Sequence, residues 1–256
     1  MKTYDFFVDY YDEIIRWNWY SLNDEVSLID ELITKFSFWW IDILELAVWT
    51  WVIANELEKL WYNVVWLDIS EKMLEKAKQN IKKENLILWD MRNFDLNKKF
   101  DVILCNNNSI NHLLKKEDWE KMFIQSYKHL KKWWLLIFDI LTIFEFENIT
   151  RDFRWFFDVW KDTICLEMFK KESPFSDSWK NFIYEWLIKM FIFQEDKYEK
   201  DKYKLIKEVV RENSFEIEEI KEMLKKYDFE VLHLEDYHKE IVDEESERVY
   251  FVAKRL

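Results

Sequence analysis

The sequence predicts an α/β protein in which helices cover both faces of a parallel sheet and an antiparallel β cap is inserted late in the chain. Short apolar runs bounded by polar residues recur in the first half, and segments with helical periodicity separate them. Strands that are apolar throughout are typical of parallel sheets buried on both faces. Residues 182–193 instead carry apolar side chains at every second position, which indicates an antiparallel strand.

The predicted strands of the first half are five apolar runs at residues 41–47, 64–67, 86–88, 102–104 and 135–140. Two amphipathic helices are expected between them, one over 70–83 with Ser70 as its N-cap and one over 117–131. Parallel α/β sheets bind ligands at the carboxyl ends of their strands. We therefore expect the functional site after the strands that begin at 41, 64, 86 and 102.

Three segments follow from this pattern. Residues 1–149 form the predicted core, residues 150–214 form an inserted antiparallel β cap that acts as a substrate lid, and residues 215–256 complete the core. The last segment holds a predicted helix at 216–226 and two strands at 229–234 and 248–253.

Composition excludes several function classes. The net charge of −13 argues against nucleic acid as a partner, because such proteins neutralise phosphates with lysine and arginine. No apolar run reaches the roughly 18 residues of a membrane span, and the acidic N-terminus does not resemble a signal peptide. Two cysteines, Cys105 and Cys165, and four scattered histidines predict neither a disulfide framework nor a metal site. We expect a cytoplasmic protein with a small-molecule or protein substrate.

Glycine is absent from all 256 residues, although average usage of about 7% would give roughly 18, and tryptophan occurs 16 times. Many tryptophans occupy positions expected to be turns or strand ends rather than core: Trp17, Trp19, Trp39, Trp40, Trp49, Trp51, Trp61, Trp66, Trp89, Trp133 and Trp134. The pair Trp133–Trp134 after two lysines reads as a Gly-Gly helix stop and turn. Tryptophan therefore stands where glycine is expected.

Two interpretations of this composition are open. We favour a gene in which a tryptophan-or-stop codon is read as glycine in its own cell, with Trp119, inside a helical pattern, as a genuine tryptophan. The alternative is a tryptophan-rich protein stabilised by aromatic packing; a deliberately altered sequence would also give this composition. Native peptides with tryptophan at 49 and 51 would exclude the first interpretation.

The run from Asp42 to Trp51 resembles the first motif of the class I S-adenosylmethionine-dependent methyltransferases, an acidic residue in an apolar strand followed by a Gly-x-Gly turn. The resemblance implies a Rossmann-like sheet, mostly parallel with an antiparallel last strand, and S-adenosyl-L-methionine as cofactor. It places Trp49 and Trp51 at the turn glycines, Ala47 in the same turn, and Glu45 facing the methionine ammonium group.

Later segments extend the resemblance to residues 4–139 and 215–254. Asp68 ends the second strand, where the family binds the ribose hydroxyls, and Ile69 follows it. Asp90 and Met91 resemble the turn that binds the adenine amino group and packs on the ring. Cys105 begins the fourth motif, at the methyl-transfer end of the pocket.

The N-terminal segment resembles an aromatic-Tyr-Asp element of small-molecule members of the family, and this places Tyr11 over the cofactor. Each carboxylate taken alone is a common strand or turn residue, but their order along one sheet edge favours a cofactor site. Cys105 is expected to be a buried small residue. His112, near the pocket rim, is expected to serve packing.

The resemblance implies transfer of a methyl group to an unidentified small molecule, with an amine among the candidates and no catalytic residue assigned. An indole at 49 or 51 would occupy the volume that the cofactor needs, so we expect binding only with glycine there. Two alternatives differ in class. Glycines at 49 and 51 would also approximate the nicotinamide-binding fingerprint of an NAD(P)-dependent oxidoreductase, and genuine tryptophans would favour a non-catalytic interaction protein.

Overall fold

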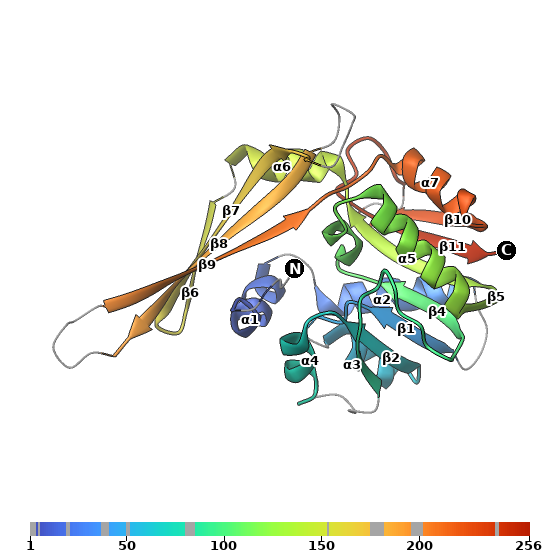
Figure 1. Cartoon of the computed structure of the whole chain (residues 1–256), viewed down its shortest axis with the longest axis horizontal. Helices are drawn as coiled ribbons and strands as arrows, with labels where there is room; N and C mark the ends of the chain where they lie inside the picture. Colours follow the sequence, from blue (N-terminus) through green and yellow to red (C-terminus); the bar gives the residue numbers. More distant parts are fainter. Residues whose placement is uncertain are drawn as a thin grey trace.

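The computed structural model describes residues 4, 6–18, 21–36, 41–49, 52–79, 85–152, 154–174, 182–195, 202–238 and 241–256. These residues form a seven-stranded sheet flanked by helices and a separate four-stranded sheet that projects away from it (Figure 1). No helix among them has the length and apolar character needed to cross a membrane.

The seven-stranded sheet is mostly parallel, as predicted. Strands β5, β4, β1, β2 and β3 are parallel, whereas β11 runs antiparallel to both of its neighbours, β5 and β10. The order across the sheet is β10 (Phe229–Asp236), β11 (Arg248–Arg255), β5 (Leu130–Leu141), β4 (Phe100–Cys105), β1 (Asp42–Leu46), β2 (Asn63–Asp68) and β3 (Leu86–Leu88). The antiparallel strand is the last in the chain and confirms the predicted sheet.

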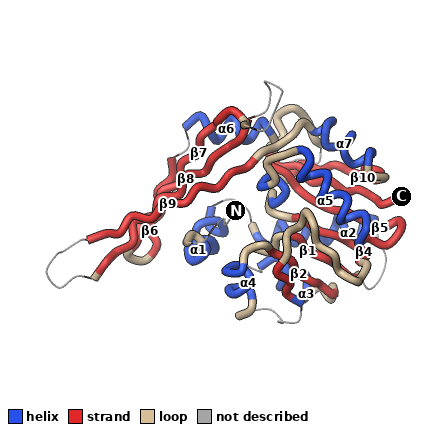
Figure 2. The backbone as a smooth tube through the Cα atoms, viewed as in Figure 1, coloured by secondary structure: helices blue, strands red, loops and turns tan. Residues whose placement is uncertain are grey.

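Helices lie over the faces of this sheet and along the four-stranded sheet, as Figure 2 shows by colour. They are α1 (Val8–Asn18), α2 (Leu22–Phe36), α3 (Val52–Lys59), α4 (Glu71–Ala77), the short helix η2 (Ser109–His112), α5 (Lys116–His129), α6 (Ile143–Asp152) and α7 (Ile217–Lys226). The Ser70 hydroxyl accepts a hydrogen bond from the backbone N–H of Met73 over 3.3 Å, so Ser70 is the predicted N-cap of α4.

Two predicted helix ends were wrong. Helix α4 ends at Ala77 rather than at 83, although residues 80–84 lie outside the described part of the chain. Helix α5 ends at His129, and Lys131 already belongs to β5. Strand β5 therefore begins at Leu130, directly after the helix, since extended backbone there pairs with β4.

The hydrophobic core fills both sides of the sheet. All six residues of β4 are buried, because the strand lies in the middle of the sheet with helices over both faces. On one face Trp119 and Phe123 of α5 pack with Phe138, and on the other Ile29 and Ile33 of α2 pack with Ile43. The carboxyl ends of β1 and β4 thus emerge from a rigid, fully packed layer.

The second sheet is antiparallel throughout, with the order β6 (Arg154–Val159), β7 (Asp162–Glu172), β8 (Phe182–Gln194) and β9 (Lys202–Glu212). Helix α6 packs against it through Phe146, whose ring stacks on Tyr184 with centroids 4.3 Å apart. Helix α1 contacts it as well, because the Tyr10 hydroxyl donates to Asp162 over 2.7 Å. We call this four-stranded sheet the cap.

One buried amide joins the two sheets where the chain leaves the first and returns from the second. The Asn111 side chain donates to the carbonyl oxygens of Leu141 and Asn213, over 3.1 and 2.8 Å. Its side-chain oxygen accepts from the backbone N–H of Leu141 over 3.1 Å. Asn111 thereby bonds the end of β5 and the residue that follows β9.

Several tryptophans differ from the expected turn and strand-end positions. Trp66 is fully buried inside β2, and Trp17 lies within α1. Trp133 and Trp134 lie in β5 rather than in a turn, but the pairing with β4 is interrupted there, from Phe100 opposite Leu130 to Val102 opposite Leu135. Trp19, Trp39, Trp40 and Trp51 lie outside the described residues.

Candidate active site

The first predicted site residues lie at the carboxyl end of β1, in the centre of the sheet. Glu45 is 3% exposed and pairs in register with Trp66 of β2 on one side and Leu104 of β4 on the other. The chain then turns at Ala47 and Trp49, both with positive φ of 60° and 52°. Trp51, the other predicted turn residue, falls outside the part of the chain that the structure describes.

Glu45 is a buried carboxyl group with an unused acceptor. Its Oε2 atom is shielded from solvent and makes no hydrogen bond with the described residues. Burial, with the neighbouring charges of Glu25 and Asp68, raises the pKa of Glu45 to about 8. A positively charged ligand group beside Oε2 would restore the ionised form and supply the missing hydrogen bond.

Asp68 ends β2 next to this turn. Its Oδ2 atom accepts a hydrogen bond from the backbone N–H of Trp49 over 3.1 Å, and Oδ1 accepts from that of Ser70 over 2.7 Å. Burial raises the pKa of Asp68 to about 6, although these backbone bonds lower it. Asp68 therefore fixes the turn after β1, and the exposed side chain of Ile69 follows it.

A cavity opens along the same strand ends. Its lining includes Ala47, Ile69, Asp90, Met91, His112 and Arg211, and we call it the strand-end cavity. Four predicted cofactor contacts thus share one cavity, although they come from three separate turns of the chain. This grouping is the arrangement expected for an elongated ligand lying across the carboxyl ends of β1, β2 and β3.

Asp90 is paired within this cavity. Arg92 donates to both of its carboxylate oxygens, through Nε over 3.0 Å and through a terminal nitrogen over 2.6 Å. Burial raises the pKa of Asp90, but the hydrogen bonds from Arg92 outweigh it and hold that pKa below its usual value. Asp90 is therefore ionised, and a ligand amino group would share it with Arg92.

Cys105 ends β4 and is fully buried. Burial raises the pKa of its thiol well above the usual value, and the charges of Asp139 and Glu45 add to this. A thiol that stays protonated is a poor nucleophile. Cys105 is accordingly the buried small residue that the sequence predicts, and Cys165 in the cap is likewise a buried free cysteine.

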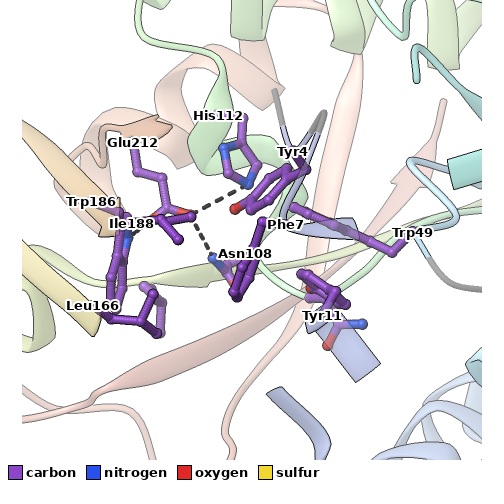
Figure 3. A pocket seen from close by; sticks show the side chains of 12 residues that line it. Tyr4, Phe7, Tyr11, Trp49, Asn108, His112, Leu166, Trp186, Ile188 and Glu212 are labelled. Atoms are coloured by element: carbon purple, nitrogen blue, oxygen red, sulfur yellow. Dashed lines mark hydrogen bonds and ion pairs between the residues drawn. The ribbon is translucent and has the colours of Figure 1, made fainter. Parts of the chain in front are cut away.

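A second cavity lies between the sheet and the cap. Its lining includes Tyr4, Phe7, Tyr11, Trp49, Trp186 and Glu212, and we call it the aromatic cavity (Figure 3). The Tyr11 ring stacks on the Trp49 indole with centroids 5.1 Å apart and planes inclined by 15°. His112 lines both cavities, so the two adjoin at this residue.

Glu212, at the end of β9, is the polar centre of the aromatic cavity. It accepts hydrogen bonds from Trp186 Nε1 over 2.7 Å and from Asn108 Nδ2 over 3.2 Å, while His112 Nε2 lies 3.4 Å from its Oε1 (Figure 3). Burial raises the pKa of Glu212 to about 7, although the bonds from Trp186 and Asn108 lower it. Burial also lowers the pKa of His112 to about 4, so this imidazole is neutral at physiological pH.

Sequence reasoning missed Glu212, included Asn108 only as part of the fourth motif from Cys105 to Ser109, and gave His112 only a packing role. Glu212 ends a strand whose alternation indicates a cap and nothing more. Its proximity to Asn108, 104 residues earlier, depends on how the cap folds back over the first sheet. No local pattern in the sequence carries that information.

Known proteins resemble this chain in sequence and in structure. Residues 43–133 match the family described as methyltransferase domain. A Geobacillus protein named as a methyltransferase is 26% identical over 83% of this chain and 84% of its own length. A glycine/sarcosine N-methyltransferase from Halorhodospira halochloris is 31% identical over 53% of this chain and 52% of its own.

Solved structures agree with this match. A Clostridium acetobutylicum S-adenosylmethionine-dependent methyltransferase superposes with a TM-score of 0.79, at 25% identity over 98% of each chain. Residues 43–133 are therefore a methyltransferase domain, and the structure around them has the fold of the class I S-adenosylmethionine-dependent methyltransferases. An amino pentose methyltransferase from Micromonospora echinaspora shares the fold, with a TM-score of 0.71 at 18% identity over 96% of this chain and 97% of its own.

The residues present fit the cofactor of this family except at one position. The unused Oε2 atom of buried Glu45 suits a cationic group, and the strand-end cavity brings together the side chains of Ala47, Ile69, Asp90 and Met91. In this methyltransferase fold, however, the turn after the first strand must present bare backbone to the cofactor. Trp49 places an indole there, stacked on Tyr11 and in tilted contact with His112. The turn with tryptophan at position 49 therefore does not accept S-adenosylmethionine.

Proposed function

We propose that this methyltransferase, with glycine at positions 49 and 51, transfers the methyl group of S-adenosyl-L-methionine to the nitrogen of a small-molecule amine in the cytoplasm. The observation that carries the proposal is the buried carboxyl group of Glu212, which lies among aromatic side chains in the cavity next to the strand-end cavity. A carboxylate inside an aromatic enclosure favours a cationic or hydrogen-bond-donating partner, because both the charge and the ring faces attract it.

The cofactor half of the proposal assigns roles to the residues at the strand ends. Glu45 would bind the ammonium group, Asp68 the ribose hydroxyls, and Asp90 the adenine amino group. Ala47, Ile69, Met91 and Cys105 would form walls around these groups, and Tyr11 would cover the cofactor from α1. The burial of Glu45, Asp68 and Cys105 and the common cavity of Ala47, Ile69, Asp90 and Met91 support this division.

The acceptor half rests on the titration of Glu212. Its pKa of about 7 lies near physiological pH, so it can accept a hydrogen bond from an amine N–H as a carboxylate or hold the proton that the amine releases. His112, neutral and 3.4 Å away, offers a second polar contact. An amine must lose its proton before its nitrogen can accept a methyl group. The Glu212 carboxylate can accept that proton.

The printed names of the relatives favour the same substrate class. The glycine/sarcosine N-methyltransferases and the amino pentose methyltransferase are named for acceptors that contain amino nitrogen. No similarity to an NAD(P)-dependent oxidoreductase supports that alternative. The free, buried state of Cys105 and Cys165 agrees with a reducing cytoplasm.

The test compares the chain that carries Trp49→Gly and Trp51→Gly with the chain that has tryptophan at both positions. Calorimetric titration with S-adenosylhomocysteine should show binding only to the substituted chain. Transfer of labelled methyl from S-adenosylmethionine should then occur to small amines and not to alcohols of the same carbon skeleton.

The possible outcomes separate the two halves of the proposal. Binding without transfer to any amine, or transfer to the matched alcohols, would refute the amine assignment and leave the cofactor assignment intact. A folded, substituted chain that does not bind S-adenosylhomocysteine would refute the assignment of the strand-end cavity.

A further inference from the structure

The backbone conformation sorts the tryptophans of this chain into two groups. Nine non-glycine residues in the described part have positive φ: Tyr4, Ala47, Trp49, Trp61, Asn107, Asn108, Trp133, Trp160 and Asp228. Asparagine and aspartate tolerate this region because their short polar side chains bond locally. Tryptophan has no such compensation, and yet it provides four of the nine.

The indoles at three of these positions gain little from packing. Trp61 is 87% exposed, Trp160 is 76% exposed and Trp133 is 57% exposed. Left-handed backbone is sterically unfavourable for an L-residue, and an exposed indole recovers little of this cost through burial. Glycine would adopt the same backbone without steric cost.

The fourth position, Trp49, has a buried indole whose Nε1 atom donates to Ser109 Oγ over 2.5 Å, so its assignment rests on its positive φ and on its conflict with the family's cofactor. Its backbone N–H is fixed by Asp68, so the turn has the shape of a strand-to-helix ligand turn, while its side chain fills the space in front of that turn. Trp66 adds a related conflict inside β2, because its indole is fully buried and its Nε1 atom makes no hydrogen bond with the described residues. A buried donor without an acceptor is costly.

Trp119 and Trp186 lie in environments that suit a tryptophan side chain. Trp119 is fully buried in α5, its Nε1 donates to the Leu113 carbonyl over 2.7 Å, and its ring meets Phe215 edge-on at 5.1 Å. Trp186 is 7% exposed and donates to Glu212 over 2.7 Å. Buried tryptophans normally find a partner for the indole N–H.

We infer that the native polypeptide has glycine at positions 49, 61, 66, 133 and 160 and tryptophan at positions 119 and 186. The two groups would correspond to two different codons, one of which the cell reads as glycine. One gene with two such codons explains both the absence of glycine from the sequence and the well-packed indoles at positions 119 and 186. The inference concerns the identity of the residues and does not depend on which acceptor the enzyme methylates.

The inference can be tested in the sequence of the gene and in the mass of the native protein's peptides. The standard code has one tryptophan codon, so the gene should show a second codon, shared by positions 49, 61, 66, 133 and 160 and different from the codon at 119 and 186. One codon at all seven positions would overturn the inference.

Peptide mass spectrometry of the protein from its native cells identifies the residue at each position by its mass. The tryptic peptide 60–72 contains positions 61 and 66, whereas peptide 117–121 contains only Trp119 as an internal control. We expect glycine masses in the first and a tryptophan mass in the second. Tryptophan in peptide 60–72 would contradict the inference even if the enzyme binds S-adenosylhomocysteine, and glycine there would uphold it even if binding fails.

Discussion

Arg248 Nε donates a hydrogen bond to Asp139 Oδ2 over 2.6 Å, and both side chains are fully buried between β11 and β5. Arg248 also pairs with Glu25 of α2. One guanidinium thus bridges two buried carboxyl groups from different elements. The pair joins the antiparallel strand β11 to the centre of the sheet, close to the residues that follow β4, because Asn108 N–H also donates to Asp139 over 2.9 Å.

Replacing Arg248 by methionine should destabilise the protein by about 3–5 kcal/mol, because Asp139 and Glu25 would lose their counter-charge inside the core. Urea unfolding at neutral pH measures the change. Lys254→Met is the matched control: Lys254 pairs with Glu230 near the surface of the same strand, and such pairs contribute about 0–1 kcal/mol. Equal losses in the two variants would contradict the importance of burial.

Replacing Glu45 by glutamine should stabilise the unliganded protein at alkaline pH, on the order of 1 kcal/mol. The folded-state pKa of Glu45 is about 8 and the ordinary value is 4.5, so the folded state binds more protons between these values. Stability therefore falls as pH rises through that window, and the variant avoids this loss. Urea unfolding at pH 4.5 and pH 9 should show a gain at pH 9 only; an equal gain at both would contradict the buried-charge explanation.

The same Glu45→Gln change should weaken S-adenosylhomocysteine binding in the chain with glycine at 49 and 51, by tenfold or more, which corresponds to about 1.4 kcal/mol. The lost interaction is that between a buried carboxylate and the ligand ammonium group. Glu230→Gln, a surface change on β10, serves as the control. Unchanged affinity in the Glu45 variant would show that the ammonium group binds elsewhere.

Replacing Glu212 by glutamine should raise KM for an amine acceptor about tenfold and remove a pH dependence centred near 7. The Glu212 carboxyl group ionises as pH rises through 7, so acceptor binding by the parent enzyme should improve over that interval. Steady-state kinetics from pH 6 to pH 8.5 measure this effect in the glycine-substituted chain. A variant that keeps the parent's pH profile would assign the titration to another group.

Trp61→Gly and Trp119→Gly should shift stability in opposite directions. The first relieves positive φ at an exposed residue and should stabilise by about 1 kcal/mol. The second removes a buried indole and should cost roughly 3–5 kcal/mol. Thermal unfolding of both variants makes the comparison, and destabilisation of similar size in each would contradict the division into two groups.

The sequence was sufficient to predict the first sheet, because its strands are short apolar runs whose order along the chain fixes a parallel arrangement. It also indicated the antiparallel second sheet from the alternation in residues 182–193, although the division at 150 and 214 into core and cap remains a prediction. Helix ends were less accurate, since His129 continues into β5 with no breaking residue between them.

The candidate site divides in the same way. Glu45 lies within a predicted strand, and Asp68 and Asp90 follow two others, so their common edge could be expected from the sequence alone, although their roles in binding remain proposals. Glu212 could not be expected, because its neighbours in space belong to η2 and to the loop that leads into it. The pairing of Asp90 with Arg92 could not be predicted from the sequence either, since it depends on side-chain geometry within a turn.

The Asn111 amide bears on how enzymes of this shape could change substrate. The same side chain bonds Leu141 and Asn213, so the chain leaves for the cap and returns from it at nearly the same point. An insertion with adjoining ends can be lengthened, replaced or exchanged without moving the strands that flank it. Acceptor choice could therefore diversify by module exchange at this junction while the methyl-donor half of the enzyme stays constant.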